Sequence, residues 1–468
     1  MRGETGDMMM AVTYTPEAGE TPVPLIALCE EDLSAWREDA SPLEQGLAGA
    51  DFRARPGQVV IVPGPDGKPA RILLGLGASP GEASAFRTLA GRLPPGEFRL
   101  EGRPSGLEPT DAALAFALGL YRFERYRRRE TAPPQLFVPG ADVAEVESLA
   151  EACALARDLI NTPANDLGPA ELEGAARELA GRFGAGIEVI AGDELLAKGY
   201  PAVHAVGRAA APGREPRMIE ITWGEAGRPG LVLVGKGVMF DTGGLDLKPS
   251  AGMRLMKKDM GGAAHVLALG AMVMEARLPV RLSILVPTVE NAVSGDAMRP
   301  GDVLATRKGL SVEVGNTDAE GRLILADALT RASELSPDLT LDLATLTGAA
   351  RVALGPQLPP FFTDDDDLAA AIEAGARKAS DPVWRLPLWK GYLPSLETEI
   401  ADLKNDPDAW AQAGAMTAAL FLQKFAPAGA WAHFDIFAWN PRAQPGYPAG
   451  GEAQAIRGLF AMLKARYA

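Results

Sequence analysis

The strongest constraint on the fold is the alternation of two apolar periodicities between residues 170 and 343. Helix-like spacing occurs at Ala170–Arg182, Ala263–Ala276 and Glu320–Leu335, and near-continuous apolar runs occur at Ile187–Ile190, Arg217–Thr222, Gly230–Val234, Arg281–Pro287 and Thr340–Leu343. Strands that are apolar throughout are buried on both faces. The pattern therefore predicts an α/β fold with a mixed sheet flanked by helices.

The length of 468 residues exceeds what one ordinary core accommodates, so we expect two α/β domains. The first, residues 1–140, has short strand-like runs at Pro24–Cys29, Val59–Val62 and Arg71–Gly75, the last two joined as a hairpin across 65–68. The second, residues 141–468, opens with a linking helix over 141–162.

An amphipathic helix from Asp111 to about Arg128 is expected to close the first domain, before the polar, Pro-rich stretch Arg129–Pro134. Its end is basic, with Arg122, Arg125, Arg127, Arg128 and Arg129. We interpret these arginines as a solvated C-terminal turn, where cations interact favourably with the helix dipole.

Composition excludes several classes of protein. No uncharged apolar run approaches the roughly 18 residues of a membrane span, and Met1–Val12 does not resemble a signal peptide. Only Cys29 and Cys153 are present, which agrees with a reducing compartment, so we expect a cytoplasmic protein. The net charge of −15 opposes binding to nucleic acid.

The octapeptide 316–323, Asn-Thr-Asp-Ala-Glu-Gly-Arg-Leu, concentrates charge between a strand-like and a helix-like run. In an extended segment Asp318, Glu320 and Arg322 share one face, and Gly321 relieves crowding. Two acids beside one fixed cation suit a metal with an anion held against it. The alternative is that Asp318 is a helix N-cap and the other two are surface charges.

A second cluster follows the strand-like run ending at Val234 and supplies Lys236, Asp241, Lys248 and Asp259. Ligands in open α/β sheets bind beyond the carboxyl ends of strands, where Lys236 and Asp241 would fall. Asp259, before Gly261 and Gly262, could instead be a helix N-cap.

The two clusters together offer four carboxylates, which would repel one another unless divalent cations neutralise them. Two such ions can activate water for hydrolysis, and Mn²⁺, Zn²⁺ and Mg²⁺ all accept carboxylate ligands. A lysine can ligate only as the neutral amine. Histidine occurs only at positions 204, 265 and 433, each in an apolar setting, so hydrolysis would proceed largely without imidazole.

These motifs resemble the leucine aminopeptidase family, the M17 cytosol aminopeptidases. The resemblance rests on the octapeptide 316–323, on Gly-Lys-Gly at 235–237 with Phe-Asp-Thr-Gly-Gly at 240–244 and Lys248, and on Met-Lys-Lys-Asp-Met-Gly-Gly at 256–262. Further matches lie at 121–123, 157–165, 344–349, 386–388 and 431–436, whereas the first 110 residues match only loosely.

The resemblance implies a homohexameric aminopeptidase that removes the N-terminal residue of peptides with two metal ions and bicarbonate. One ion would be held by Lys236, Asp241, Asp259 and Glu320, and the other by Asp241, Asp318 and Glu320. Lys248 would stabilise the oxyanion, and Arg322 would hold a bicarbonate that accepts the proton.

The resemblance also implies a pocket for the N-terminal side chain, formed by Met256, Thr345 and Gly348. Phe437 stands where relatives usually have Ala, and Asn440 where a Met lines the pocket. We expect a smaller, more polar pocket and a weaker preference for leucine, unless Phe437 turns into the core or a subunit contact and leaves the pocket unchanged. Two other functions remain as alternatives: a dinuclear metallohydrolase of another small substrate, and a non-catalytic DNA-binding relative.

Overall fold

The computed structural model describes residues 21–468 apart from 50, 80–82, 129 and 408–411. The chain forms two compact units, Met1–Ala154 with Asn440–Ala449, and Leu155–Trp439 with Gly450–Ala468. The expected domain boundary at 140/141 stays a prediction. Grouping of the segment 440–449 with the first unit was not indicated by the sequence. The expectation about Met1–Val12 lies outside the described residues.

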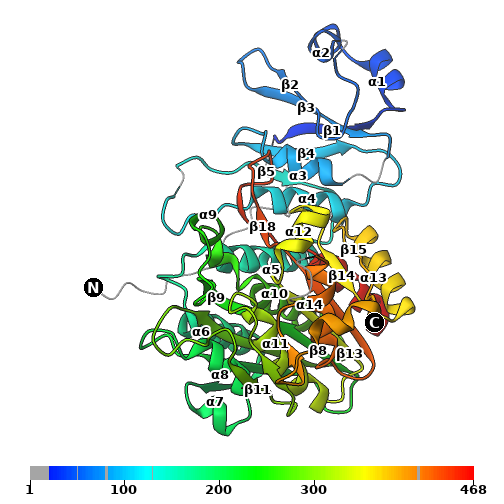
Figure 1. The fold of residues 1–468 in the computed structure, drawn as a ribbon. Helices are drawn as coiled ribbons and strands as arrows, with labels where there is room; N and C mark the ends of the chain where they lie inside the picture. The colour runs from blue at the N-terminus through cyan, green and yellow to red at the C-terminus, as the bar shows by residue number, and fades with distance from the viewer. Residues whose placement is uncertain (1–20, 50, 80–82, 129, 408–411) are drawn as a thin grey trace. The chain divides into compact units, whose positions relative to one another are not determined.

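The first unit is built on a five-stranded sheet in the order β2-β3-β1-β4-β5 (Figure 1). The strands are β1 (Val23–Cys29), β2 (Val59–Pro63), β3 (Pro69–Gly77), β4 (Glu97–Gly102) and β5 (Gln135–Phe137). The helices are α1 (Leu33–Asp39), α2 (Pro42–Ala48), α3 (Ser84–Ala90) and α4 (Pro109–Leu120). The predicted hairpin is confirmed, because β2 and β3 pair antiparallel across a turn in which Gly67 has φ of 75°.

The predicted helix over 111–128 is wrong at its C-terminal end. Helix α4 begins at Pro109 and ends at Leu120, and Tyr121 is extended with φ of −51° and ψ of 133°. Beyond Tyr121 the chain offers only two aromatic residues among arginines, which is too little apolar surface to bury a helix face. Arg122, Arg125, Arg127 and Arg128 are therefore not on a helix, and Arg129 lies outside the described residues.

The second unit contains a nine-stranded sheet in the order β15-β14-β17-β13-β8-β10-β7-β6, with β9 paired to β10. Its strands are β6 (Gly186–Ala191), β7 (Arg217–Trp223), β8 (Gly230–Gly235), β9 (Gly237–Asp241), β10 (Arg281–Asn291), β13 (Leu339–Ala344), β14 (Pro360–Phe362), β15 (Trp384–Arg385) and β17 (Ala430–Asp435). The sheet is mixed, because β8, β10, β13 and β17 run parallel whereas β7 pairs antiparallel with β10. The predicted fold class is confirmed.

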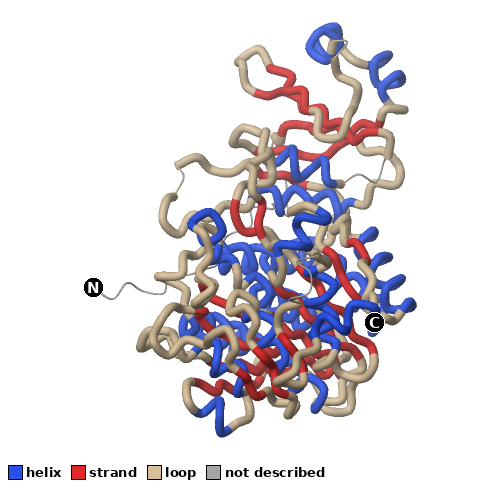
Figure 2. Tube along the Cα trace, in the orientation of Figure 1, coloured by secondary structure: helices blue, strands red, loops and turns tan. Residues whose placement is uncertain are grey.

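Helices cover both faces of this sheet, as the helices around the strands in Figure 2 illustrate. Along β8 the side chains alternate: Val232 and Val234 belong to the core cluster that contains Leu323 of α11 (Glu320–Glu334), whereas a Cβ on Gly235 would meet Val266 of α10 (Gly261–Glu275). The two central helices therefore lie on opposite faces. Both were predicted within a residue or two.

The remaining elements surround this core. The other helices are α5 (Val143–Asn161), α6 (Pro169–Phe183), α7 (Glu194–Ala197), α8 (Pro201–Gly207), α9 (Ser250–Met253), α12 (Gly348–Leu354), α13 (Asp366–Lys378), α14 (Gly414–Gln423) and α15 (Ile456–Tyr467), with 3₁₀ turns η1 (Met256–Lys258) and η2 (Lys390–Leu396). The short strands are β11 (Val303–Ala305), β12 (Ser311–Glu313), β16 (Leu403–Lys404), β18 (Trp439–Asn440) and β19 (Gly450–Gly451). Helix α5 covers most of the range 141–162 expected for a linking helix, and its linking role stays a prediction. Within the described part of the chain, no helix combines the length and apolarity of a membrane span.

Candidate metal centre

The parallel strands of the second unit deliver polar residues to one edge of the sheet. Lys236 directly follows β8, Asn291 is the last residue of β10, and Thr345 directly follows β13. Because these strands run parallel, their carboxyl ends meet at the same edge. This is the arrangement that the sequence predicted for Lys236 and Asp241, which ends β9 beside β10.

Three buried carboxylates converge at this edge. Asp241, Asp259 and Glu320 are each at most 3% exposed, and each offers an oxygen within 4.8 Å of the others. Asp241 ends a strand, Asp259 follows η1, and Glu320 begins α11, so the three come from separate elements. The two sequence clusters therefore meet in one site.

Lys236 lies inside the carboxylate cluster. Its Nζ is 2.7 Å from Oδ2 of Asp259 and 2.8 Å from Oε1 of Glu320, and it donates to the carbonyl oxygen of Thr345 at 3.2 Å. The side chain passes directly over Gly321, where a Cβ would lie 2.6 Å from the Lys236 Cε. The glycine of the octapeptide is therefore needed for space beside Lys236 and not for a bend.

Lys248 connects the fourth carboxylate, that of Asp318, to the cluster by forming two ion pairs. Its Nζ lies 2.8 Å from Oδ2 of Asp241 and forms a second ion pair with Oδ1 of Asp318. Asp318 is about one-third exposed, so it stands at the rim of the site. Oδ1 of Asp241 accepts from the backbone N–H of Gly243 at 2.8 Å.

The electrostatics of the site oppose full ionisation of its acids. Burial, reinforced by the charge on Asp241, raises the pKa of Glu320 to about 8 and that of Asp318 to about 6. Burial also acts on Asp259, but the adjacent Lys236 and Lys258 ammonium groups outweigh it and lower its pKa. The protein by itself leaves part of the negative charge uncompensated.

The donor set fits divalent cations. Neither oxygen of Glu320 has a well-oriented hydrogen-bond donor among the described residues, although Oε1 lies close to Lys236. Oδ2 of Asp259 and Oδ1 of Asp318 share this property, and buried polar atoms in proteins are normally satisfied. Three of these four oxygens meet only a lysine ammonium, and Oε2 of Glu320 meets none. Buried carboxylate oxygens of this kind, gathered from several elements, are suitable ligands for divalent metal ions.

The N-cap alternatives for Asp259 and Asp318 do not hold. The N-cap of α10 is Met260 and that of α11 is Ala319, and neither helix receives a side-chain cap. Oδ1 of Asp259 instead accepts from the hydroxyl of Thr345 at 2.8 Å. Both acidic side chains are directed to the cluster.

Arg322 is buried on the first turn of α11, with 8% exposure. Its Nη1 donates to the carbonyl oxygen of Asn405 at 2.6 Å, whereas its Nε has no partner among the described residues. Burial lowers the pKa of Arg322, and Asp406 and Glu320 partly offset that effect. A buried guanidinium with a free donor is suited to holding an anion.

The predicted pocket residues fall at different places in the second unit. Thr345 is 5% exposed, and its hydroxyl is bonded to Asp259. Met256 begins η1 and is half-buried, and Gly348 begins α12 with open space where a Cβ would be. Thr345 therefore also orients a carboxylate of the cluster, which the sequence did not indicate.

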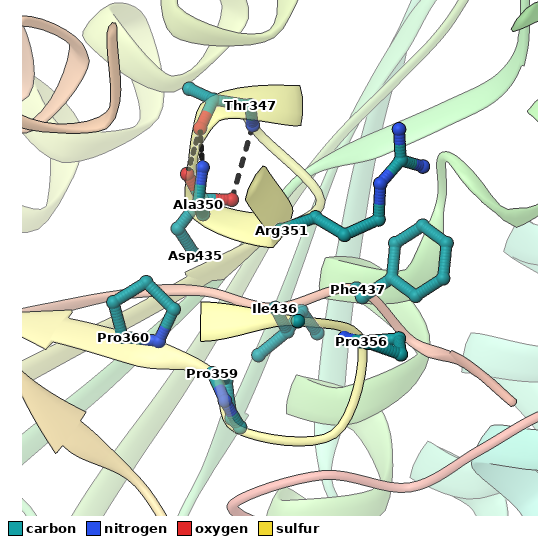
Figure 3. A pocket seen from close by; sticks show the side chains of 10 residues that line it. Thr347, Ala350, Arg351, Pro356, Pro359, Pro360, Asp435, Ile436 and Phe437 are labelled. Atoms are coloured by element: carbon teal, nitrogen blue, oxygen red, sulfur yellow. Dashed lines mark hydrogen bonds between the residues drawn. The ribbon is translucent and has the colours of Figure 1, made fainter. Parts of the chain in front are cut away.

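Phe437 and Asn440 have different surroundings. The ring of Phe437 has its centroid 5.0 Å from Nζ of Lys258 and 5.0 Å from Cζ of Arg351, and Figure 3 shows it beside Arg351 at a small pocket. Asn440 belongs to the other compact unit, where its amide donates to the carbonyl oxygens of Tyr447 and Pro448, each at 3.0 Å. A role for either in substrate selection stays a prediction.

Sequence reasoning missed the residues that brace the site. Nδ2 of Asn291 donates to Oδ1 of Asp241 at 2.8 Å and to the carbonyl oxygen of Thr317 at 3.0 Å. The feature of the sequence that could have indicated Asn291 is its position at the end of an apolar strand. Nδ2 of Asn405, which follows the two-residue strand β16, donates to the carbonyl oxygen of Asn316 at 2.8 Å, and no sequence pattern pointed to it.

Comparison with known proteins agrees with this geometry. Residues 154–460 match the catalytic domain of the cytosol aminopeptidase family, and residues 23–139 match the M17 aminopeptidase N-terminal domain. A probable cytosol aminopeptidase of Syntrophotalea carbinolica is 39% identical over 457 residues, covering 90% of this chain and 91% of that protein.

Solved structures give the same result. The cytosol aminopeptidase from Coxiella burnetii is similar with a TM-score of 0.92 and 44% identity, covering 98% of this chain and 100% of that one. The bottromycin maturation enzyme BotP in complex with Mn is similar with a TM-score of 0.85 and 37% identity, covering 95% and 99%. The chain therefore belongs to the M17 cytosol aminopeptidase family and is a metallopeptidase with aminopeptidase activity.

Proposed function

We propose that this chain releases N-terminal residues from peptides with two divalent ions per subunit held by its buried acidic cluster. Lys236, Asp241, Asp259 and Glu320 would hold one ion, and Asp318 with the shared Asp241 and Glu320 would hold the other. The structure of a relative in complex with Mn supports manganese as a candidate, and zinc and magnesium also accept this donor set.

The observation that carries the proposal is the state of Glu320. It is 1% exposed, has no well-oriented hydrogen-bond donor among the described residues, and offers an oxygen within 4.8 Å of ligand atoms on Asp241 and Asp259. The one cation beside it, Lys236 at 2.8 Å from Oε1, is shared with Asp259, so the charge of an ionised Glu320 is only partly compensated, and burial makes that costly. Bound divalent ions supply that compensation, polarise the scissile carbonyl and activate water.

The remaining residues supply orientation and proton handling. Lys236 would ligate as the neutral amine, which a nearby dication favours by depressing the pKa of its ammonium. Lys248, at the rim with its side chain 15% exposed, would donate to the developing oxyanion of the substrate. Arg322, whose Nε has no partner among the described residues, would hold a bicarbonate that accepts the proton in place of a histidine.

The test is metal removal and add-back. Aminoacyl-4-nitroanilides and short peptides are assayed after chelation and after addition of Mn²⁺, Zn²⁺ or Mg²⁺, together with metal analysis of wild type and Glu320→Ala. We expect activity only with metal, and loss of both activity and metal in the variant, because a shared ligand serves both ions. Full activity in metal-free protein, or two ions per chain in Glu320→Ala, would disprove the assignment.

Assembly and location are also proposals. The chain would form a homohexamer and act in the cytoplasm, as the family name and the two buried cysteines, Cys29 and Cys153, suggest. DNA binding is not favoured, because the net charge is −15 and all the expected ligand positions are occupied by ligand residues. No observation favours another small substrate over peptides.

A further inference from the structure

A second cavity lies in the catalytic unit, lined by none of the candidate metal ligands. It has a volume of about 150 Å³, which accommodates a benzene-sized group. Its floor is the edge of the sheet, where Ile190 of β6 pairs with Met218 of β7, and both are at most 8% exposed. One part of the cavity is therefore apolar.

Two carboxylates extend this sheet face, but only one is neutralised. Glu188 and Glu220 stand directly opposite each other on β6 and β7, a pairing that like charges disfavour. Both Nε and Nη2 of Arg331 donate to Glu220 at 3.0 Å, and this forked pair satisfies it. Glu188 is exposed and forms no ion pair with any described residue, so its carboxylate is available to a ligand in the cavity.

Two further residues that line the cavity carry donors that bond to no described residue. Tyr200 is 3% exposed, and its hydroxyl forms no hydrogen bond with a described residue although it lines the cavity. The guanidinium carbon of Arg307 covers its ring at 4.4 Å, and burial raises the pKa of Tyr200 to about 12, so the hydroxyl stays a donor. Lys198, two residues earlier, is exposed and forms no ion pair with any residue that the structure describes.

The arginines do not alter this balance. Arg307 is paired through two nitrogens with Glu334, at 2.8 and 2.9 Å, and Arg331 is occupied by Glu220. Counting described partners only, one carboxylate, one ammonium and one phenolic hydroxyl remain unpaired around an apolar floor. These groups complement a small zwitterion whose ammonium faces Glu188 and whose carboxylate faces Lys198 and Tyr200.

We propose that this cavity, the edge site, binds a free α-amino acid with a medium-sized apolar side chain, such as leucine or methionine. The side chain would rest on Ile190 and Met218. An aminopeptidase releases amino acids of this kind, so the edge site would meet the products of its own reaction. Arg331, beside the edge site, and Glu320, in the metal cluster, lie on the same helix α11, about 16 Å apart along its axis.

The test is binding of labelled leucine to the metal-loaded enzyme by equilibrium dialysis. We expect Glu188→Gln and Lys198→Met each to weaken edge-site binding by about tenfold, because each removes one charge-assisted contact. Tyr200→Phe should weaken it less. Glu194→Gln and Lys378→Met make the same charge changes on exposed residues outside the cavity and should leave binding unchanged.

Competition by leucine analogues is the second part of the test. Leucinol lacks the carboxylate and N-acetylleucine lacks the ammonium, so each should compete at least tenfold less well than leucine. Peptide hydrolysis by the Glu188 and Lys198 variants should stay within twofold of wild type, which separates this proposal from the catalytic one. Leucine binding that is equal in wild type and a Glu188→Gln/Lys198→Met double variant, or absent at all concentrations, would overturn the edge site.

Discussion

Gly321→Ala tests the packing of Lys236 inside the metal cluster. Gly321 is the second residue of α11, and its φ is not in the left-handed region, so alanine suits the backbone and should stabilise the helix by up to about 1 kcal/mol. The added Cβ, however, would lie 2.6 Å from Cε and 2.7 Å from Nζ of Lys236. The lysine is 2% exposed, so it has little room to move.

The magnitude follows from these distances. Nζ of Lys236 must retreat by about 0.7 Å to reach an ordinary contact with the new Cβ. Ligand distances in metal sites are held within about 0.2 Å, so the amine would leave the coordination position. We expect the metal concentration for half-maximal activity to rise by about tenfold or more, whereas strain of about 1–3 kcal/mol largely cancels the gain in helix propensity.

The assay is activity against Mn²⁺ concentration, with thermal unfolding as a measure of stability. Gly174→Ala is the matched control, because Gly174 is also inside a helix, α6, and no heavy atom lies within 4 Å of its added Cβ. The control should leave metal affinity unchanged. If Gly321→Ala binds metal and turns over substrate within twofold of wild type, Lys236 is not held against Gly321 as described.

Lys248→Ala should lower kcat by about 10²–10³ with metals retained, as expected for loss of one oxyanion donor, and a change confined to KM would contradict that role. His265 donates to the carbonyl oxygen of Gly261 at 2.6 Å and accepts from the N–H of Gln454 at 2.9 Å, and burial lowers its pKa from 6.5 to about 4. As pH falls, the unfolded chain is therefore protonated at His265 before the folded chain is, and the folded state should lose about 3 kcal/mol of stability between pH 6.5 and 4. Urea unfolding at a series of pH values measures this loss, and the loss should be smaller in His265→Gln than in wild type. Phe437→Ala should raise the ratio of kcat/KM for leucine substrates to kcat/KM for alanine substrates by about tenfold. If the wild type already prefers leucine and the substitution leaves this ratio unchanged, the pocket argument is wrong.

The fold class and the ligand positions were readable from the sequence because their signals are local. Continuous apolar runs such as 230–234 mark strands buried on both faces, and β8 was found there. The rule that ligands bind beyond the carboxyl ends of strands then placed Lys236 and Asp241 at the edge where the structure has them. The helix beginning at Glu320 was equally clear from its spacing.

The roles of single residues were harder to predict, because a sequence motif does not indicate which distant residues its side chains contact. An acid before a helix can be a cap or a ligand, and only the positions of Met260 and Ala319 at the N-caps exclude the first reading for Asp259 and Asp318. The helix predicted to reach Arg128 ends at Leu120, because helical periodicity without apolar surface to bury does not hold a helix.

By itself, the sequence determined the alternation of strands and helices, the residue types of the acidic cluster and the family, since all of these depend on neighbours along the chain. Tertiary structure alone decided which distant groups touch. Asn291 braces Asp241 across 50 residues, and Thr345 orients Asp259 across 86. The groups that line the cavity around Tyr200 become a site only when β6, β7 and α11 pack together. Such contacts depend on packing between elements, and this packing leaves no periodic pattern in the sequence.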